Sequence, residues 1–362
     1  MARNEHRGYR NVLVIQLGDI GDVVLATPTF RALKTRHPDA RISALVRRPY
    51  GSLLSADPHL HEVLEAGKGR GKLAELGREN LRLFRHLRGA RYDLVIDLRT
   101  GDRGALLALL TGASEKVAYR GDGARWRRFI FDRLIPELVP APPPAHPGGD
   151  QSLRILRAIG IGAEDSTPRL YISPDDAARV RRILSEIGLR DGDRWVTINP
   201  FSRWKYKEWG YGKWGEMIDR LWEGRRIRSL LIGSADEGTA AEEIIGPRRG
   251  RAFHVAGRTT LGELAALLSM STLHAGVDSA APHIAAAVGT ATVTIFGPSD
   301  WRSWTVVDAR HRIVAPEMPC LPCHRKGCDG TERSLCLEEL EAERVVRTAF
   351  EVLDAAGGAG RI

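Results

Sequence analysis

Short apolar runs alternate with helix-like stretches along this chain, and this alternation limits the fold more than any other feature. Strand-like runs lie at residues 12–15, 42–46, 94–96, 196–198, 229–232, 273–275 and 292–296. Helix-like patterns between them cover residues 22–36, 72–87, 213–221, 237–245 and 261–268. Strands that alternate with helices of this length predict parallel sheets built from βαβ units. The expected fold class is therefore α/β.

The alternation starts again in the middle of the chain. The stretch "SPDDAARVRRILSEIGLRDGD", residues 173–193, opens with a helix-start signal and ends in a Gly-Asp turn. The strand-like "RWVTINP" follows it, much as "RNVLVIQ" begins the first series. We expect two Rossmann-like domains, residues 1–175 and 176–362, with the ligand in a cleft at the carboxyl ends of their strands. The last helix-like stretch, residues 337–354, is expected to pack back on the first domain.

Composition indicates a globular protein with an anionic partner. Of 362 residues, 43% are hydrophobic and 27% are charged, as in soluble proteins with a sizeable core. The net charge of +9 favours nucleic acid, a nucleotide or a phosphorylated lipid surface, unless it reflects a general arginine bias. The start "MARNEHRGYRN" is charged and lacks the apolar core of a signal peptide, and the apolar run 104–113 is about half of the ~20 residues that a membrane span needs. We expect a cytoplasmic protein.

The first strand leads into a turn that does not match a dinucleotide site. In "QLGDIGDVV", residues 16–24, Gly18 and Gly21 lack the G-x-G-x-x-G spacing, and no Walker lysine follows. A Rossmann dehydrogenase is therefore the weakest interpretation. The turn instead carries two carboxylates, Asp19 and Asp22, at the end of a strand, where α/β sheets place their sites.

Three further segments follow strand-like runs. The stretch "NPFSRWKYKEW", residues 199–209, carries Ser202, Arg203, Lys205 and Lys207, which suit phosphates or form a solvated basic loop. The next segment is "LIGSADEGTAAEEI", residues 231–244. Its Glu237 either caps a helix or accepts hydrogen bonds from ribose hydroxyls.

The third segment is "GVDSAAPHIAAAVGTATVTIFGPSD", residues 276–300. Asp278 and Ser279 lie between a strand-like run and an alanine-rich helical stretch, with His283 one turn into that helix. Free amides at such a helix N-terminus can bind a pyrophosphate. Alone, the histidine is more often structural.

Together these stretches resemble glycosyltransferase family 9. The similarity is carried by "LGDIGDVVLATPTFRALK", "NPFSRWKYKEW", the 276–300 segment and the tail "CLPCHRKGCDGTERSLCL", and it is strongest to the heptosyltransferase III branch. The resemblance implies a GT-B fold with an acceptor-binding first domain and a donor-binding second domain. It also implies an inverting, metal-independent transfer of heptose from ADP-heptose to the lipopolysaccharide inner core or a related surface glycan, with no cofactor needed for catalysis.

The resemblance implies roles for individual residues. Asp22 matches the family's general base, and Lys207 matches the lysine that contacts the donor phosphates and supports the leaving group. The donor site would further include Ser202, Arg203, Glu237, Asp278, Ser279, Ala280 and His283, with Ala280 where the broader family usually has glycine. The acceptor site would include Gly18, Asp19 and Gly21.

All four cysteines of the chain lie within one short segment, as Cys320-x2-Cys323-x4-Cys328-x7-Cys336. This clustering indicates that they act as one unit. A structural zinc or iron–sulfur site, reduced thiols packed in a loop, and two disulfides all remain open, because the spacing matches no standard metal pattern well. Transfer chemistry itself needs no thiol.

The partners that follow are a nucleotide sugar and a lipid-linked anionic glycan acceptor, with peripheral contact to the inner face of the cytoplasmic membrane and no nucleic acid. Two alternatives stay open. The donor could be a UDP- or GDP-linked sugar for another surface polysaccharide. The chain could also be a nucleotide-sugar-binding scaffold subunit, although such a binder would not need a base at Asp22.

Overall fold

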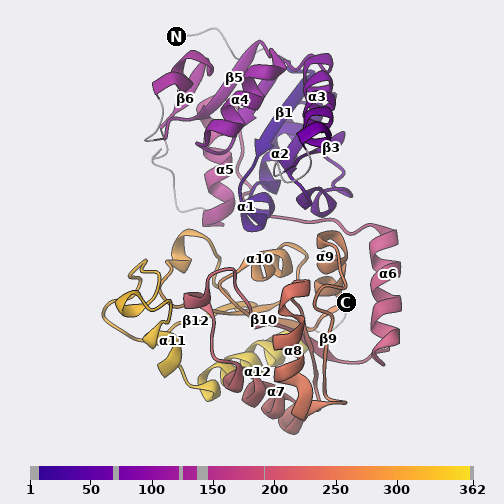
Figure 1. Ribbon diagram of the computed structural model, residues 1–362, viewed down its shortest axis with the longest axis vertical. Coiled ribbons are helices and arrows are strands. Elements are labelled where there is room, and N and C mark those ends of the chain that lie inside the picture. The colour runs from indigo at the N-terminus through magenta and orange to yellow at the C-terminus, as the bar shows by residue number, and fades with distance from the viewer. Residues whose placement is uncertain (1–7, 68–72, 122–124, 137–145, 191, 359–362) are drawn as a thin grey trace. The chain divides into compact units, whose positions relative to one another are not determined.

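The computed structural model describes residues 8–67, 73–121, 125–136, 146–190 and 192–358 (Figure 1). The chain divides into two compact units, Met1–Tyr171 and Ile172–Ile362. Each unit is an α/β structure with a single six-stranded sheet in its described part, and every strand pair in these sheets is parallel. The expected α/β class with two Rossmann-like units is confirmed.

The sheet of the first unit reverses its strand order next to its first strand. Its strands are β1 (Asn11–Gln16), β2 (Arg41–Arg47), β3 (Glu62–Ala66), β4 (Leu94–Asp97), β5 (Glu115–Tyr119) and β6 (Arg133–Ile135). They are ordered β3-β2-β1-β4-β5-β6, so the chain changes direction between β1 and β4. Such a switch point opens a crevice at the carboxyl ends of the two strands.

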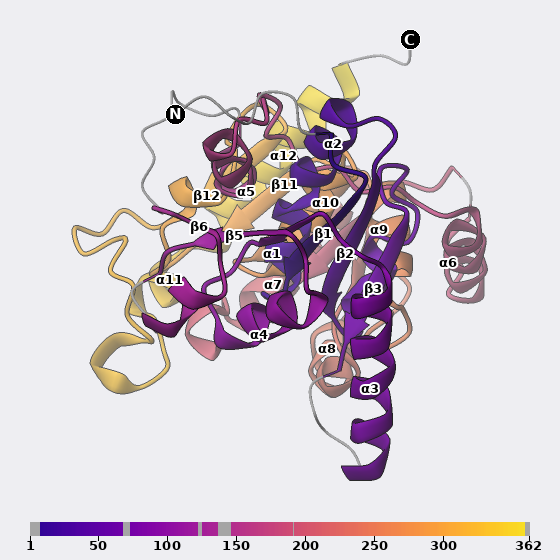
Figure 2. The ribbon, with the colours of Figure 1, turned by 90° about the horizontal axis from the view of Figure 1, so that it is seen from above.

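Helices cover both faces of this sheet. Figure 2 shows α3 (Leu73–Gly89) and α4 (Asp102–Thr111) on one face, and α2 (Thr27–Arg36) and α5 (Pro147–Ala158) on the other. The buried apolar residues of β1, β4 and α4 form a shared core with apolar residues that follow the short 3-10 helix η2 (Arg125–Phe129). The core holds the carboxyl edge of the sheet in place.

The helix expected over residues 22–36, in which Pro28 predicts a kink, is divided in the structure. The structure has two helices, α1 (Ile20–Leu25) and α2, which meet at Ala26. Pro28 lies in the first turn of α2, where its missing N–H leaves no hydrogen bond unmade. Proline therefore starts a second helix here instead of kinking one long helix.

The second unit repeats the arrangement. Its strands are β7 (Trp195–Asn199), β8 (Arg228–Leu231), β9 (Ala252–His254), β10 (Leu273–Val277), β11 (Thr292–Ile295) and β12 (His311–Val314), ordered β12-β11-β10-β7-β8-β9. Its helices are α6 (Pro174–Glu186), α7 (Tyr211–Arg225), α8 (Gly238–Ile245), α9 (Leu261–Met270), α10 (Ala280–Ala287), α11 (Leu335–Glu339) and α12 (Ala342–Gly358). The switch point lies between β7 and β10.

The Ser-Pro-Asp-Asp signal does start a helix. The Ser173 side chain accepts a hydrogen bond from the Asp176 N–H, and Pro174 occupies the first position of α6. The expected boundary between residues 175 and 176 thus falls in the first turn of α6, slightly later than the division of the structure into its two units.

The expected helix over residues 337–354 is also two helices. It breaks between α11 and α12 at Leu340, whose carbonyl accepts a hydrogen bond from the buried Trp209 indole at 2.9 Å. Trp209 in turn packs edge-on against Trp214 at 4.9 Å between ring centroids. Helix α12 contacts α7 and strands β10, β11 and β12 of its own unit. Its expected packing on the first unit stays a prediction.

Candidate active site

The first βα turn presents Asp22 at the switch point of the first sheet. Asp22 is the third residue of α1, and its Oδ2 accepts the Asp19 N–H at 2.8 Å. A Cβ on Gly18 would lie 2.2 Å from that Oδ2. Glycine is therefore required at position 18 to make room for the Asp22 carboxylate. Its expected part in the acceptor site stays a prediction.

Arginines from the neighbouring strands face both carboxylates. Arg99, after β4, places its guanidinium 3.2 Å from Asp22 Oδ1, and Arg47, at the end of β2, lies 3.3 Å from Asp19 Oδ1. Burial and the charge of Arg47 lower the pKa of Arg103, in the first turn of α4. Arg47, Arg99 and Arg103 together form what we call the arginine edge of the first unit.

A buried arginine holds the loop that carries Arg99. Arg127, on η2, is 1% exposed. Its guanidinium donates to the carbonyls of Gly101 at 3.1 Å and Arg99 at 3.2 Å, and lies 3.7 Å from Asp97 Oδ2. Asp97 Oδ1 accepts the Arg99 N–H at 3.1 Å. The loop after β4 is thus held from its buried side, and these bonds fix the position of the Arg99 backbone.

Asp97 itself is an unusual acid. It is fully buried at the end of β4, and Oδ2 has no hydrogen-bond partner. Burial raises the pKa of Asp97 to about 7, against the opposite effects of the Arg99 N–H and the charges of Arg127 and Arg99. The Asp97–Arg127 contact is therefore sensitive to pH close to neutrality.

In the second unit, the ends of β7 and β10 bring together two of the expected segments. Lys207 Nζ lies 2.6 Å from Asp278 Oδ2, and both side chains are largely buried. Beside them, Asn199 Nδ2 donates to Ser279 Oγ at 2.9 Å. These two cross-links join the 199–209 segment to the start of α10.

The rest of the 199–209 segment is organised around Glu208. Its Oε1 accepts the Ser202 N–H at 3.1 Å and the Lys205 ammonium at 2.9 Å. Arg203 is exposed, with its guanidinium 5.1 Å from the centre of the Trp204 ring. Lys205 is therefore paired with Glu208, whereas Lys207 faces Asp278.

Glu237 caps the short helix that follows β8. Its Oε2 accepts the Ser234 N–H at 2.6 Å. A Cβ on Gly233 would lie 2.8 Å from that Oε2 and 2.9 Å from the buried Phe201 ring. Glu237 is therefore close to the 199–209 segment, and the capping interpretation describes its contact in the structure. Its ribose role stays a prediction.

The remaining donor-site candidates lie on α10. Ser279 is the residue before the helix, Ala280 is its first residue, and His283 is one turn in; all three are half-buried. Beneath them on β10, His274 is fully buried with Nδ1 3.0 Å from Thr197 Oγ1. Burial lowers the pKa of His274 to about 3, so this second histidine is a neutral core residue.

The four cysteines are free thiols in the structure, which does not contain the two disulfides that the sequence left open. Cys320 is exposed, Cys323 and Cys328 are half-buried, and Cys336 is buried. Burial raises the pKa of the Cys336 thiol to about 11, and the three other thiols act in the same direction. Within the described residues, no group of three or more His, Cys, Asp or Glu side chains is arranged to hold a metal ion. Of the three alternatives left open by the sequence, a zinc or iron–sulfur site therefore has no support in this geometry.

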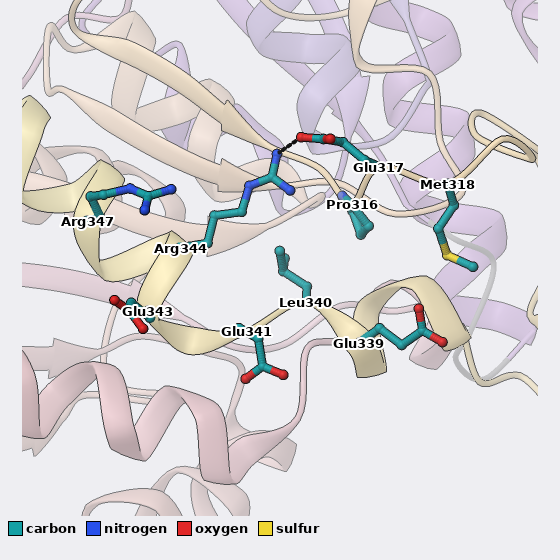
Figure 3. A pocket seen from close by; sticks show the side chains of 9 residues that line it. All are labelled: Pro316, Glu317, Met318, Glu339, Leu340, Glu341, Glu343, Arg344 and Arg347. Carbon is teal, nitrogen blue, oxygen red and sulfur yellow. Dashed lines mark hydrogen bonds and ion pairs between the residues drawn. The ribbon is translucent and has the colours of Figure 1, made fainter.

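A pocket of about 370 Å³ lies in the second unit, away from the residues expected from the sequence (Figure 3). Carboxylates and two arginines line it, and Arg344 is paired with Glu317 at 3.1 Å. It contains none of the residues at the switch point of the sheet. We therefore do not assign it to the active site.

Several site residues were missed at the sequence level. Arg99 and Asp97 follow the strand-like run 94–96, and Asn199 ends the run that precedes the 199–209 segment. A polar residue directly after a buried strand is a usable signal for all three. Arg127 has no such signal because it does not directly follow a strand.

The fold and the site define a two-unit α/β protein whose polar side chains gather where each parallel sheet reverses its strand order. The sequence model of glycosyltransferase family 9 (heptosyltransferase) matches residues 80–332. Lipopolysaccharide heptosyltransferase 3 of Escherichia coli K12 is 32% identical over 299 residues, covering 79% of this chain and 83% of the relative. This chain belongs to glycosyltransferase family 9, and it is a glycosyltransferase.

Solved structures agree on the fold. E. coli ADP-heptose LPS heptosyltransferase II matches with a TM-score of 0.76 at 20% identity, over 96% of this chain and 99% of that chain. E. coli heptosyltransferase WaaC with ADP matches with a TM-score of 0.74 at 17% identity, over 94% and 99%. The expected resemblance to the family, its heptosyltransferase III branch and its GT-B fold is confirmed. No helix in the described part of the chain is both long enough and apolar enough to cross a membrane.

Replacing Asp97 by Asn should change how stability depends on pH. The raised pKa means that between about pH 4 and pH 7 the folded protein holds a proton that the unfolded chain has lost. The free energy of unfolding of the wild type should therefore fall as pH rises through this window, relative to Asp97→Asn, by at most about 1.4 kcal/mol per pH unit. Urea denaturation of both proteins across the window measures the difference, and parallel pH profiles would contradict the assignment.

Proposed function

We propose that this protein transfers heptose from ADP-heptose to the inner core of lipopolysaccharide, with inversion at the anomeric carbon and without a metal ion. The family membership supports heptose as the sugar, and the lipopolysaccharide heptosyltransferase 3 of E. coli K12 supports the acceptor. The solved relatives named for ADP-heptose and ADP support the nucleotide. The observation that carries the proposal is the placement of Asp22 at one switch point and of the Lys207–Asp278 pair at the other.

In the proposed step, the acceptor hydroxyl oxygen attacks the anomeric carbon of the heptose. The bond from that carbon to the oxygen of the ADP β-phosphate breaks, and ADP leaves with the electron pair. The hydroxyl proton passes to the Asp22 carboxylate. A positioned base of this kind contributes about 10²–10⁴ in rate. Asp22 suits the role because its Oδ2 is held by the Asp19 N–H, which aims Oδ1 away from the backbone.

Lys207 is the proposed counter-charge for the leaving diphosphate. In the structure its ammonium rests on Asp278, which places it at the start of α10 before a donor binds. The free amides there and the Lys207 ammonium would stabilise the charge that gathers on ADP, so the step needs no cation. The proposed donor site is completed by Ser202, Arg203, Ser279, Ala280 and His283. Glu237 would accept hydrogen bonds from the ribose hydroxyls.

The arginine edge is the proposed binding site for the anionic acceptor, next to Gly18, Asp19 and Gly21. Arg47 and Arg99 now face Asp19 and Asp22, and acceptor phosphates would compete for both. Arg99 must leave Oδ1 before the acceptor hydroxyl can reach it. Acceptor binding would thus uncover the base. A lipid-linked acceptor implies work in the cytoplasm at the inner face of the membrane.

The four-cysteine segment has no part in this step. A structural metal at Cys320, Cys323, Cys328 and Cys336 remains a hypothesis for folding of the segment, to be tested by metal analysis of anaerobically purified protein.

Asp22→Asn should abolish most of the transfer without affecting donor binding. Asparagine keeps the size of the side chain and can still accept the Asp19 N–H, but it cannot take the proton. We expect kcat to fall by about 10²–10⁴, with an unchanged Kd for ADP by calorimetry. Near wild-type turnover in this variant would remove Asp22 from the role of base.

Lys207→Ala should weaken ADP binding and turnover together, whereas Lys205→Ala serves as the matched control. Both lysines belong to the same short 3-10 helix, but only Lys207 faces Asp278, since Lys205 pairs with Glu208. We expect ADP affinity to fall at least about tenfold for Lys207→Ala, the scale of one lost charge-assisted contact, and to change little for Lys205→Ala. Equal effects of the two substitutions would contradict the proposed phosphate contact.

Arg99→Ala should raise KM for a phosphorylated acceptor by about tenfold, and much less for the same acceptor after phosphatase treatment. The reason is that only the phosphorylated acceptor offers Arg99 a stronger partner than Asp22. Arg41→Ala is the control, because Arg41 is exposed at the opposite end of β2. A KM that rises equally for both acceptors would show that Arg99 does not recognise phosphate.

A further inference from the structure

The surface of the first unit at α4 and η2 exposes large apolar side chains. Leu106 and Leu109 of α4 are 51% and 48% exposed, and Phe129 of η2 is 77% exposed. Leu106 and Leu109 are three residues apart and share one face of α4. Trp126, at 38%, is likewise three residues before Phe129, a spacing that aligns side chains in a 3-10 helix.

The buried Arg127 joins these two elements. It lies between Trp126 and Phe129 in sequence, and its guanidinium donates to the carbonyl of Gly101, the residue that precedes α4. The short helix η2 is thereby fastened to the start of α4. Helix α3 packs beside α4 and exposes Leu81 and Phe84 in its second half. The apolar side chains therefore belong to one continuous layer of elements on one face of the sheet.

The same elements are strongly basic. Where the structure describes their side chains, their exposed arginines are Arg82, Arg85 and Arg88 of α3, Arg103 of α4, and Arg125 and Arg128 of η2. In residues 80–90, 102–111 and 125–129, the one acidic side chain is Asp102. The Arg128 guanidinium lies 4.8 Å from the centre of the Phe129 ring, so charge and aromatic surface adjoin.

We propose that α4 and η2, flanked by α3, form the docking surface of this protein for a membrane rich in anionic phospholipid. Leucine, phenylalanine and tryptophan enter the interface between headgroups and acyl chains, while arginine is attracted to anionic headgroups. A second copy of this chain would have to place these arginines against one another, and like charges disfavour that contact. The combination of apolar and basic side chains thus fits lipid best.

The position of this surface deepens the proposed function, on which this step rests. Helix α4 follows β4, and η2 follows β5, so both begin near the carboxyl edge of the sheet where Arg99 faces Asp22. A docked membrane would lie next to the arginine edge. The glycan of a lipid-linked acceptor could then reach Asp22 while its lipid stays in the bilayer.

The test measures vesicle binding by the full-length protein. Flotation with phosphatidylethanolamine vesicles, with and without phosphatidylglycerol, should show binding that requires the anionic lipid. Leu106→Ser/Phe129→Ser should weaken it at least about tenfold, the scale expected from withdrawing two large apolar side chains from the interface. Val307→Ser should not weaken it; Val307 is an apolar residue of the second unit that is 46% exposed, close to the 51% of Leu106. Arg125→Glu/Arg128→Glu should abolish the preference for anionic vesicles.

Transfer to a water-soluble acceptor fragment separates this proposal from the proposed function. The Leu106→Ser/Phe129→Ser variant should keep wild-type turnover on the fragment and lose it on acceptor embedded in vesicles. Vesicle binding that is unchanged in both double variants would overturn the docking surface. So would a wild-type dimer, seen by sedimentation, that Phe129→Ser converts to monomer. Absence of transfer to the fragment by the wild type would instead count against the proposed function alone.

Discussion

The contacts of Arg127 are the constraint on which the first unit depends. Its guanidinium holds two carbonyls of the loop after β4 and lies beside Asp97 in the core. On one side, the loop carries Arg99 to Asp22. On the other, the backbone of η2 is held so that Phe129 points outward. One buried charge thus sets both the surroundings of the proposed base and the exposed surface beside it.

A buried arginine is a costly way to build a loop, because its charged guanidinium must be taken out of water. The cost is offset here by backbone carbonyls, which need donors wherever a strand ends inside the protein. Asp97 contributes less than a normal ion pair, since its pKa of about 7 keeps part of the population neutral near pH 7. The carbonyl bonds therefore hold the loop at any pH, and Asp97 modulates them.

The buried parts of the fold follow from local sequence, and much of the site does not. All seven strands expected from apolar runs are present, whereas five others, β3, β5, β6, β9 and β12, have no such run. Strands β6 and β9 have only three residues each, and β3, β5 and β12 carry charged or polar residues among few apolar ones. Asp22 and Lys207 could be named because they follow strands and match a known motif. Arg99 follows a strand, a local signal, but its carbonyl is also held by Arg127, which lies far along the chain, and no local pattern encodes that contact.

Glu237 and Asp22 show why capping and function need not exclude one another. Each carboxylate uses one oxygen to accept the backbone N–H three residues earlier, Ser234 for Glu237 and Asp19 for Asp22. That bond stabilises the start of a helix and also removes the rotational freedom of the side chain. A second oxygen then points in a set direction, and for Asp22 it meets Arg99. A capping carboxylate at the end of a parallel strand is therefore also oriented for a ligand. Helix capping and ligand binding are thus compatible roles for one residue.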